Sequence, residues 1–257
     1  MKLLVKLGGT LLDEEASRQR LSREIAAVAA MPGILVTVVH GGGKQMTRYL
    51  AERGVESRFA GGLRVTTPEV VDAVLKVFAG SVNHQLVASL VAAGSDAVGL
   101  SGIDACLTEA EQWSEELGAV GRPVRCNARL LDVLTGAGYL PVVACVAGDR
   151  QGRIYNVNAD QMAAACAAGF QADRLIFLTD VVGVLDADKR ILPELDRAAS
   201  EGLIAAGVAT GGMQAKLEAA HRALDGGVPR VCIAPGAEPG ILARLLSGEN
   251  TGTSLVR

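Results

Sequence analysis

The sequence of 257 residues is poor in features that several large classes of protein require. Aromatic residues make up only 3% of it, too few for the stacking platforms that bind single-stranded nucleic acids. The formal net charge is −3, whereas nucleic-acid-binding domains are basic. These two features lead us to expect no nucleic-acid partner. No uninterrupted run of about 18 apolar residues is present, so we also expect no membrane span. The remaining composition, 49% hydrophobic and 21% charged, is ordinary for a soluble globular enzyme.

Cysteine and histidine are also scarce. The cysteines are odd in number and form no CxxC pair, which predicts free thiols in a reducing compartment; they are Cys106, Cys126, Cys145, Cys166 and Cys232. The apolar stretch between Lys2 and Lys6 is too short for the core of a signal peptide, so we expect a cytoplasmic protein. The histidines lie far apart and form no metal-ligand motif, so we expect no metal site built from the protein alone.

Strand and helix patterns alternate along the chain. Short apolar runs predict strands at Lys2–Lys6, Ile34–Val39, Asp96–Leu100, Tyr139–Val146, Arg174–Leu178 and Arg230–Ala234. Helical spacing predicts helices at Asp13–Ala30, Lys44–Arg53, Pro68–Ala93, Ala128–Ala137, Val157–Ala168 and Thr210–Leu224, and Trp113–Cys126 suggests a hairpin. This alternation predicts an α/β fold whose mostly parallel sheet binds ligands beyond the carboxyl ends of its strands.

Two of the predicted strands end in glycine turns, VKLGGT (Val5–Thr10) and VVHGGGK (Val38–Lys44). Glycine lets the backbone approach a ligand and point N–H groups at it. The second turn is not a P-loop, because Val38 stands where that motif needs glycine and Gln45 where it needs Ser or Thr. One such turn is commonly only a tight turn, but two at the ligand-binding edge, one directly after Lys6, favour a site for an anion.

Three further clusters could contribute to the same site. GGLRVT (Gly61–Thr66) carries an arginine, the side chain that clamps carboxylates through two hydrogen bonds, although Arg64 could also be an ordinary surface residue. NVNAD (Asn156–Asp160) has more polar residues at a helix start than capping explains. GGMQAK (Gly211–Lys216) places a lysine one turn into a helix, where a solvated side chain is the simpler interpretation.

Taken together, six motifs resemble the amino acid kinase family. They occur in the order of the family and span nearly the whole chain: KLGG (Lys6–Gly9), HGGG (His40–Gly43), GLRVT (Gly62–Thr66), NVNAD (Asn156–Asp160), TDVVGVL (Thr179–Leu185) and GGMQAK (Gly211–Lys216). NVNAD and GLRVT favour the branch whose acceptor is N-acetyl-L-glutamate. Lys44, Gln45 and Thr210–Gly211 depart from the forms common in the family, at positions that tolerate variation.

The resemblance implies a three-layer αβα sandwich of the carbamate kinase-like type with two lobes. Residues 1–178 would bind the acyl amino acid and form the dimer, and residues 179–257 would bind ATP. The implied reaction, part of arginine biosynthesis, is ATP + N-acetyl-L-glutamate → ADP + N-acetylglutamyl 5-phosphate. Mg²⁺ would be held mainly through the nucleotide phosphates.

The resemblance also implies roles for individual residues. Lys6 and Lys216 would neutralise the phosphoryl group in transfer, Asp160 would hold the two lysines, and the Gly9 N–H would face the moving phosphate. The acyl amino acid would be held by Gly42, Gly43, Arg64 and Asn156. The nucleotide would be lined by Thr179, Asp180, Val181, Gly183, Val184, Leu185, Val208, Ala209 and Thr210.

Elementary electrostatics agrees with this chemistry. A carboxylate acceptor has a reference pKa of about 4.3, so it is ionised near neutrality and needs no general base. The obstacle is repulsion between an anionic nucleophile and an anionic polyphosphate, about 4 kcal/mol for two unit charges 4 Å apart at an effective dielectric constant of 20. Fixed lysines, glycine N–H groups and Mg²⁺ offset that repulsion, which is how phosphoryl transfer is catalysed.

Two alternatives stay open. GLSGID (Gly99–Asp104) and the ending LLSGENTGTSLVR also look like a sister branch that phosphorylates 2-aminoadipate or glutamate linked to a carrier protein. A catalytically silent regulatory member of the fold is the other alternative. Such a protein is expected to have lost Lys6, Asp160 or Lys216, and all three are present.

We expect a homodimer. Arginine-inhibited members of the family carry an additional helix before the first strand, which here begins at Lys2, so we also expect insensitivity to arginine. The helix Pro68–Ala93 is the candidate dimer face, because Val70, Val74, Val77 and Phe78 recur on neighbouring turns. The same pattern would suit a helix buried within one chain.

Overall fold

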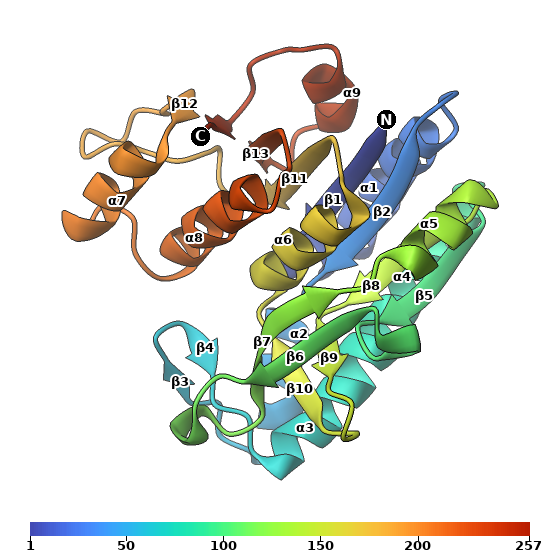
Figure 1. Cartoon of the computed structure of the whole chain (residues 1–257), viewed down its shortest axis with the longest axis vertical. Coiled ribbons are helices and arrows are strands. Elements are labelled where there is room, and N and C mark those ends of the chain that lie inside the picture. The colour runs from blue at the N-terminus through green and yellow to red at the C-terminus, as the bar shows by residue number, and fades with distance from the viewer.

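The computed structural model describes residues 1–257 and is built on a central eight-stranded sheet (Figure 1). The strand order is β12-β14-β13-β11-β1-β2-β8-β5. All neighbouring pairs are parallel except β13 with β14. The strands are β1 (Lys2–Leu7), β2 (Leu35–His40), β5 (Ala97–Ser101), β8 (Leu140–Ala144), β11 (Arg174–Thr179), β12 (Glu194–Leu195), β13 (Arg230–Pro235) and β14 (Thr253–Leu255).

Helices cover both faces of this sheet, so the predicted αβα sandwich with a mostly parallel sheet is confirmed. In Figure 1, α8, α6 and α5 lie in front of the sheet, and α7 packs on α8. These helices are α5 (Arg129–Gly136), α6 (Ala159–Phe170), α7 (Arg197–Ala205) and α8 (Gly211–Asp225). Behind the sheet lie α1 (Glu15–Ala29), α4 (Asn83–Ala92) and α9 (Ile241–Leu246).

Smaller elements gather beyond the carboxyl ends of β1 and β2. A closed four-stranded sheet contains β6 (Thr108–Gln112), β7 (Val120–Cys126), β9 (Val146–Gly148) and β10 (Ile154–Val157). A two-stranded ribbon contains β3 (Phe59–Ala60) and β4 (Leu63–Arg64), and α2 (Gly43–Ala51) and α3 (Pro68–Val74) lie beside these sheets. Short 3₁₀ turns occur at Gly9–Leu12, Asp104–Cys106 and Glu115–Leu117.

Two predicted boundaries were wrong in this region. The hairpin begins at Thr108 rather than Trp113, because β6 pairs with β7 from Thr108 onward. The helix expected from Val157 begins at Ala159, because the residues up to Val157 pair with β7 and β9 as a strand. Asn158 then caps α6 by accepting hydrogen bonds from the N–H groups of Asp160 and Gln161.

The long helical run from Pro68 to Ala92 is continuous but not uniform. Between α3 and α4, residues Leu75–Val82 form a π-helical segment, which the sequence pattern did not predict. By length and composition this 25-residue run could cross a membrane, because an 18-residue window within it has a mean hydropathy of 1.3, although we expected no such helix. That expectation counted only unbroken apolar runs. The run packs on α1, β5 and β8, and a core helix of this kind satisfies the same criteria.

The four residues that we expected to mark a dimer face on this run were wrong. Val70, Val74, Val77 and Phe78 are all buried within the single chain and belong to its hydrophobic core. A repeated apolar stripe identifies the covered side of a helix, but it does not identify what covers it.

Candidate active site

The two glycine turns meet in space because β1 and β2 are neighbouring parallel strands, with Leu7 opposite His40. A Cβ atom on Gly9 would lie 3.0 Å from the backbone nitrogen of Gly43 and 3.1 Å from that of Gly42. A Cβ on Gly42 would lie 2.9 Å from the ring of Phe78. Larger residues would therefore push the turns apart. The helix α2 begins at Gly43, so its positive end adds to the backbone N–H groups gathered here.

Beside these turns, two lysines converge on one carboxylate. Lys6 near the end of β1 lies with its Nζ 2.6 Å from Asp160 Oδ1, and Lys216 of α8 lies with its Nζ 3.4 Å from Oδ2 of the same residue. Burial raises the pKa of Asp160, but the charges of Lys6 and Lys216 outweigh it and lower the pKa, so the carboxylate is ionised. The lysines are 210 positions apart in the chain (216 − 6), and their expected convergence is observed.

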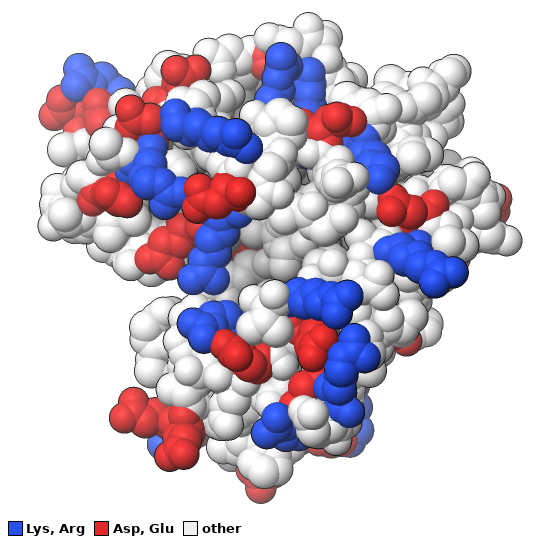
Figure 2. Space-filling model, in the orientation of Figure 1, with Lys and Arg blue, Asp and Glu red and all other residues white.

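A cavity of about 220 Å³ opens in front of Lys6 and the two turns. Figure 2 shows the surface hollowed between the part of the molecule that carries α7 and α8 and the part that carries β3 and β4. The cavity contains every residue that the sequence assigned to the acyl amino acid, together with three of the four catalytic candidates: Gly42, Gly43, Arg64, Asn156, Lys6, Gly9 and Asp160. Lys216 does not line it and reaches the cluster only through Asp160.

Arg64 is held firmly at the wall of this cavity. Its guanidinium donates to Ser57 Oγ, to Thr47 Oγ1 at 2.8 Å and to the Gly43 carbonyl at 3.2 Å. Its guanidinium carbon lies 4.6 Å from the centre of the Phe59 ring. Both Nη groups of the guanidinium are thus engaged by the protein, whereas its Nε–H donates to no protein atom and can donate to a ligand. Burial lowers the pKa of Arg64, yet an arginine keeps its charge in proteins.

Asn156 is fixed through a neighbouring hydroxyl. Its Nδ2 donates to Thr66 Oγ1 at 3.0 Å, and that hydroxyl donates to the Arg64 carbonyl at 2.8 Å. The strand β10 sets the position of Asn156 by pairing it with Val120 of β7. These hydrogen bonds use only the Nδ2 group of Asn156, so its amide oxygen can accept a hydrogen bond from a ligand.

A buried histidine supports the second glycine turn. His40 Nδ1 donates to the Gly41 carbonyl at 2.9 Å, and its Nε2 accepts from Asn83 Nδ2 at 3.0 Å. Asn83 also donates to the Val142 carbonyl at 2.9 Å, which fixes the direction of its amide. Burial lowers the pKa of His40 to about 4, so the ring is neutral at pH 7. A neutral ring is the form that these two hydrogen bonds require.

The residues expected to line the nucleotide lie at the end of β11, in the segment after it and directly before α8. Thr179, Val184 and Ala209 are buried, whereas Asp180, Val181 and Thr210 are exposed. The remaining candidates, Gly183, Leu185 and Val208, lie in the same two segments. Burial raises the pKa of Asp180, but its hydrogen bonds and the charge of Lys216 outweigh burial, so the pKa is lowered and the carboxylate is ionised. No group of three His, Cys, Asp or Glu side chains gathers anywhere in the chain to hold a metal ion.

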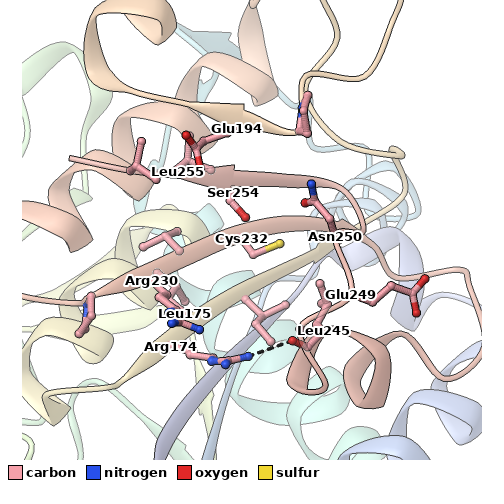
Figure 3. A pocket seen from close by; sticks show the side chains of 16 residues that line it. Arg174, Leu175, Glu194, Arg230, Cys232, Leu245, Glu249, Asn250, Ser254 and Leu255 are labelled. Atoms are coloured by element: carbon pink, nitrogen blue, oxygen red, sulfur yellow. Dashed lines mark hydrogen bonds between the residues drawn. The ribbon is translucent and has the colours of Figure 1, made fainter.

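A larger cavity of about 550 Å³ lies at the opposite, amino-terminal edge of β11 and β13 (Figure 3). Arg174 and Arg230 begin those strands, and Arg174 donates to the Leu245 carbonyl at 2.9 Å. None of the predicted site residues lines this cavity. The smaller cavity is the better active-site candidate despite its size, because it combines a buried ion cluster with two glycine turns.

Sequence reasoning missed four residues of this site: His40, Asn83, Thr66 and Phe78. His40 lies in the motif HGGG and Thr66 in the motif GLRVT. Their polar side chains within these motifs could have identified them as site residues. Asn83 gave none, because it lies 43 residues from His40 in the middle of a helical run. Phe78 was assigned to a dimer face and instead packs on Gly42.

Comparison with known proteins gives consistent results. The model of the amino acid kinase family matches residues 1–235. An acetylglutamate kinase of Solibacter usitatus (strain Ellin6076) is 67% identical over 256 residues, which cover 100% of this chain and 99% of that protein. One of Rhodospirillum centenum (strain ATCC 51521 / SW) is 40% identical over 99% of this chain and 88% of its own.

Solved structures agree on the fold. The N-acetylglutamate synthase from Neisseria gonorrhoeae, complexed with coenzyme A and N-acetyl-glutamate, superimposes with a TM-score of 0.87 at 26% identity, over 100% of this chain and 59% of that one. Carbamate kinase from Giardia lamblia, bound to AMP-PNP, superimposes with a TM-score of 0.70 at 15% identity, over 99% of this chain and 98% of its own.

Proposed function

Because the chain belongs to the amino acid kinase family, we propose that it transfers the γ-phosphoryl group of ATP to the side-chain carboxylate of N-acetyl-L-glutamate. The products are ADP and N-acetylglutamyl 5-phosphate, an intermediate of arginine biosynthesis. The observation that carries the choice of substrate is the full-length identity of 67% to an acetylglutamate kinase.

The reaction needs positive charge more than it needs a base. Near neutrality the acceptor carboxylate is already ionised, so the barrier is its repulsion from the triphosphate. Lys6 and Lys216 carry two positive charges and Asp160 one negative, which leaves the cluster with a net charge of +1 at the edge of the cavity. Without Asp160 the two ammonium groups would repel each other and separate. We assign to Asp160 the role of holding both lysines where charge develops in the transition state.

The glycine turns supply further stabilisation. The N–H groups of Gly9, Gly42 and Gly43 would donate to oxygens of the transferred group and the acceptor, since no side chain intervenes. Arg64 would bind the carboxylate that does not react through its positive charge and its unused Nε–H, and Asn156 would accept from the acetylated amide N–H. These assignments are predictions for mutagenesis.

The nucleotide and its metal complete the proposal. ATP would lie against Asp180–Leu185 and Val208–Thr210, with its phosphates directed toward Lys216. Mg²⁺ would bind mainly through the phosphates, as this ion often does when a protein offers one or two carboxylates rather than a full set of ligands. When bound, the ion would neutralise part of the phosphate charge. On this division residues 1–178 form the acceptor lobe and residues 179–257 the nucleotide lobe.

The test is an assay of the purified protein with ATP, Mg²⁺ and a panel of acceptors. The panel contains N-acetyl-L-glutamate, free L-glutamate, N-acetyl-L-aspartate and carrier-linked 2-aminoadipate. We expect ADP release that depends on N-acetyl-L-glutamate, with an equal amount of hydroxamate when hydroxylamine traps the acyl phosphate. The variant Lys6→Met, which keeps the side-chain length without the charge, is the control. ADP release without hydroxamate, or with the carrier-linked acceptor alone, would refute the proposal.

We further propose that the protein is a cytoplasmic homodimer. The unpaired cysteines suit a reducing compartment. The strand β5 ends the sheet with an unpaired edge, and Val98 and Leu100 on it are only partly covered, as is Val91 on the adjoining α4. An unpaired apolar edge is a natural pairing surface for a second copy. Size exclusion with light scattering should give twice the chain mass of 26.5 kDa, and Val91→Glu should shift the protein toward the monomer. A wild-type monomer would contradict this proposal.

A further inference from the structure

A second cavity, outside the site described above, lies between β7 and α6 on the front face in Figure 1. Its volume is about 250 Å³, and Cys126 of β7 lines it. The wall formed by α6 consists of Gln161 and of small residues three, four and seven positions later on the same helix face, Ala164, Ala165 and Ala168. Next along this face, Gly169 lets β7 approach closely, because a Cβ there would lie 2.9 Å from Cys126 Sγ. The thiol of Cys126 is therefore seated on α6 at one end of the cavity.

Two buried groups surround the Cys126 thiol. Thr108 of β6 is the cross-strand partner of Cys126. Its Oγ1 lies 3.7 Å from the Sγ of Cys166, a residue one turn before Gly169 on α6. Hydrogen bonding from Cys166 lowers the pKa of Cys126, against the opposing effect of burial, and Thr108 lowers it further. The same contact with Cys126 raises the pKa of Cys166 well above its usual range. Of the two thiols, Cys126 is therefore the one that ionises more readily.

The other end of the cavity presents an unmet hydrogen-bond acceptor. Gln161 is only 8% exposed, and its Oε1 is buried without a donor. A buried acceptor of this kind can be satisfied by a donor from water or from a bound molecule, and a ligand with an N–H group would supply one. The exposed side chains of Arg125 and Arg222 line the cavity as well and would attract a negative charge. Along α6, Gln161 and Gly169 are eight residues apart, which is about 12 Å at the rise of an α-helix.

We propose that Cys126 is a modification site, a reactive thiol that undergoes thiol–disulfide exchange with a small anionic disulfide of peptide character. Such a molecule has an amide N–H for Gln161 and carboxylates for Arg125 and Arg222. The Cys126 thiolate attacks one sulfur of the small disulfide. A bond forms between that sulfur and Cys126, the S–S bond of the small molecule breaks, and its other half leaves as a thiolate that takes up a proton. The protein sulfur is oxidised and the small disulfide is reduced. Cys166 acts as a positioning residue that donates to the thiolate.

The experiment exposes the wild-type protein to glutathione disulfide and follows the adduct by intact mass and peptide mapping. We expect one adduct, on Cys126, formed before any on Cys106, although Cys106 is the exposed cysteine of the chain. Cys126→Ser should abolish this adduct and leave ADP formation unchanged, which shows that the variant is folded. Arg222→Ala should slow the reaction with glutathione disulfide but not with the neutral hydroxyethyl disulfide. A first adduct on Cys106 would overturn the proposal.

The role of Cys166 is tested separately by the pH dependence of Cys126 alkylation. With iodoacetamide, the wild-type rate should reach half its maximum below the pH of an ordinary thiol, and Cys166→Ala should slow alkylation at pH 7 by about tenfold. The wild-type profile needs no variant, so it remains informative if Cys166→Ala fails to fold. An ordinary profile would overturn the proposal. A product lighter by two hydrogens that links Cys126 to Cys166 would overturn the positioning role, because Cys166 would then be a nucleophile itself.

Discussion

Replacing Asp160 by asparagine removes the carboxylate that Lys6 and Lys216 share while keeping the size of the side chain. In the folded protein Lys6 is 5% exposed and its Nζ lies 2.6 Å from that carboxylate. Removing one partner of a buried ion pair leaves the other charge uncompensated and typically costs about 3–5 kcal/mol. Since whole domains are stable by only about 5–15 kcal/mol, this change should be easy to measure.

The assay is equilibrium unfolding in urea at pH 7. With a urea dependence of about 3 kcal/mol per M, expected for a chain at the upper end of the small-protein range, the midpoint should fall by about 1–2 M. Asp132→Asn is the matched control, because the ion pair of Asp132 with Lys2 is partly exposed to solvent, with side chains 48% and 28% exposed. Its loss should change the free energy of unfolding by less than about 1 kcal/mol.

The pH dependence provides a second check on the same reasoning. The pKa of Asp160 is lowered in the folded protein, so its contribution to stability is fully present above the unfolded value of about 3.9 and disappears as the pH falls through the folded value. The difference between wild type and Asp160→Asn should therefore be constant from pH 5 to 8 and shrink below pH 4. A difference under about 1 kcal/mol at pH 7, or one that persists unchanged in acid, would refute the buried-cluster reasoning.

Substitutions at four further residues should separate the remaining roles. Lys216→Ala should lower kcat with little effect on the KM for N-acetyl-L-glutamate, whereas Arg64→Ala should mainly raise that KM; steady-state kinetics showing the reverse would contradict the assignments. Gly42→Ala should reduce kcat/KM by at least about tenfold, because its methyl group would lie 2.9 Å from Phe78 and displace the turn, and Phe78→Ala in the same chain should restore part of it. His40→Asn keeps a donor for the Gly41 carbonyl, whereas His40→Gln keeps only an acceptor for Asn83. The asparagine variant should therefore retain more activity. An equal loss of activity in both variants would show that the ring serves packing alone.

Much of the site could be predicted because its chemistry is local. Glycine turns after β1 and β2 are visible as short motifs, and parallel neighbouring strands must bring such turns together. Lys6, Asp160 and Lys216 were connected only through the resemblance to a family, since no pattern in the sequence relates positions so far apart. The geometry of the structure then supplied the distances.

Other features depended on tertiary contacts and could not be predicted. The strand β10 was not predicted, and its last residue, Val157, was assigned to the following helix. Its pairing with β9 is short, and its pairing with β7 joins segments that are separated in the sequence by α5 and β8, so neither leaves a clear sequence pattern. Phe78 was predicted to face a partner because its apolar spacing is the same whichever surface covers it. The proximity of Cys126 and Cys166 was also invisible, since spacing alone does not determine which cysteines approach each other.

The π-helical segment Leu75–Val82 has a consequence for sequence change in this protein. A π-bulge is equivalent to one residue inserted into an α-helix, so deleting a single residue there would let the run relax to an ordinary helix. If α3 stayed in place, every side chain of α4 would then turn by about 100°, one residue's rotation at 3.6 residues per turn. Asn83 would no longer face His40, and Leu86 and Leu90 would leave the core. Insertions and deletions should therefore be tolerated less in this stretch than at either end of the run.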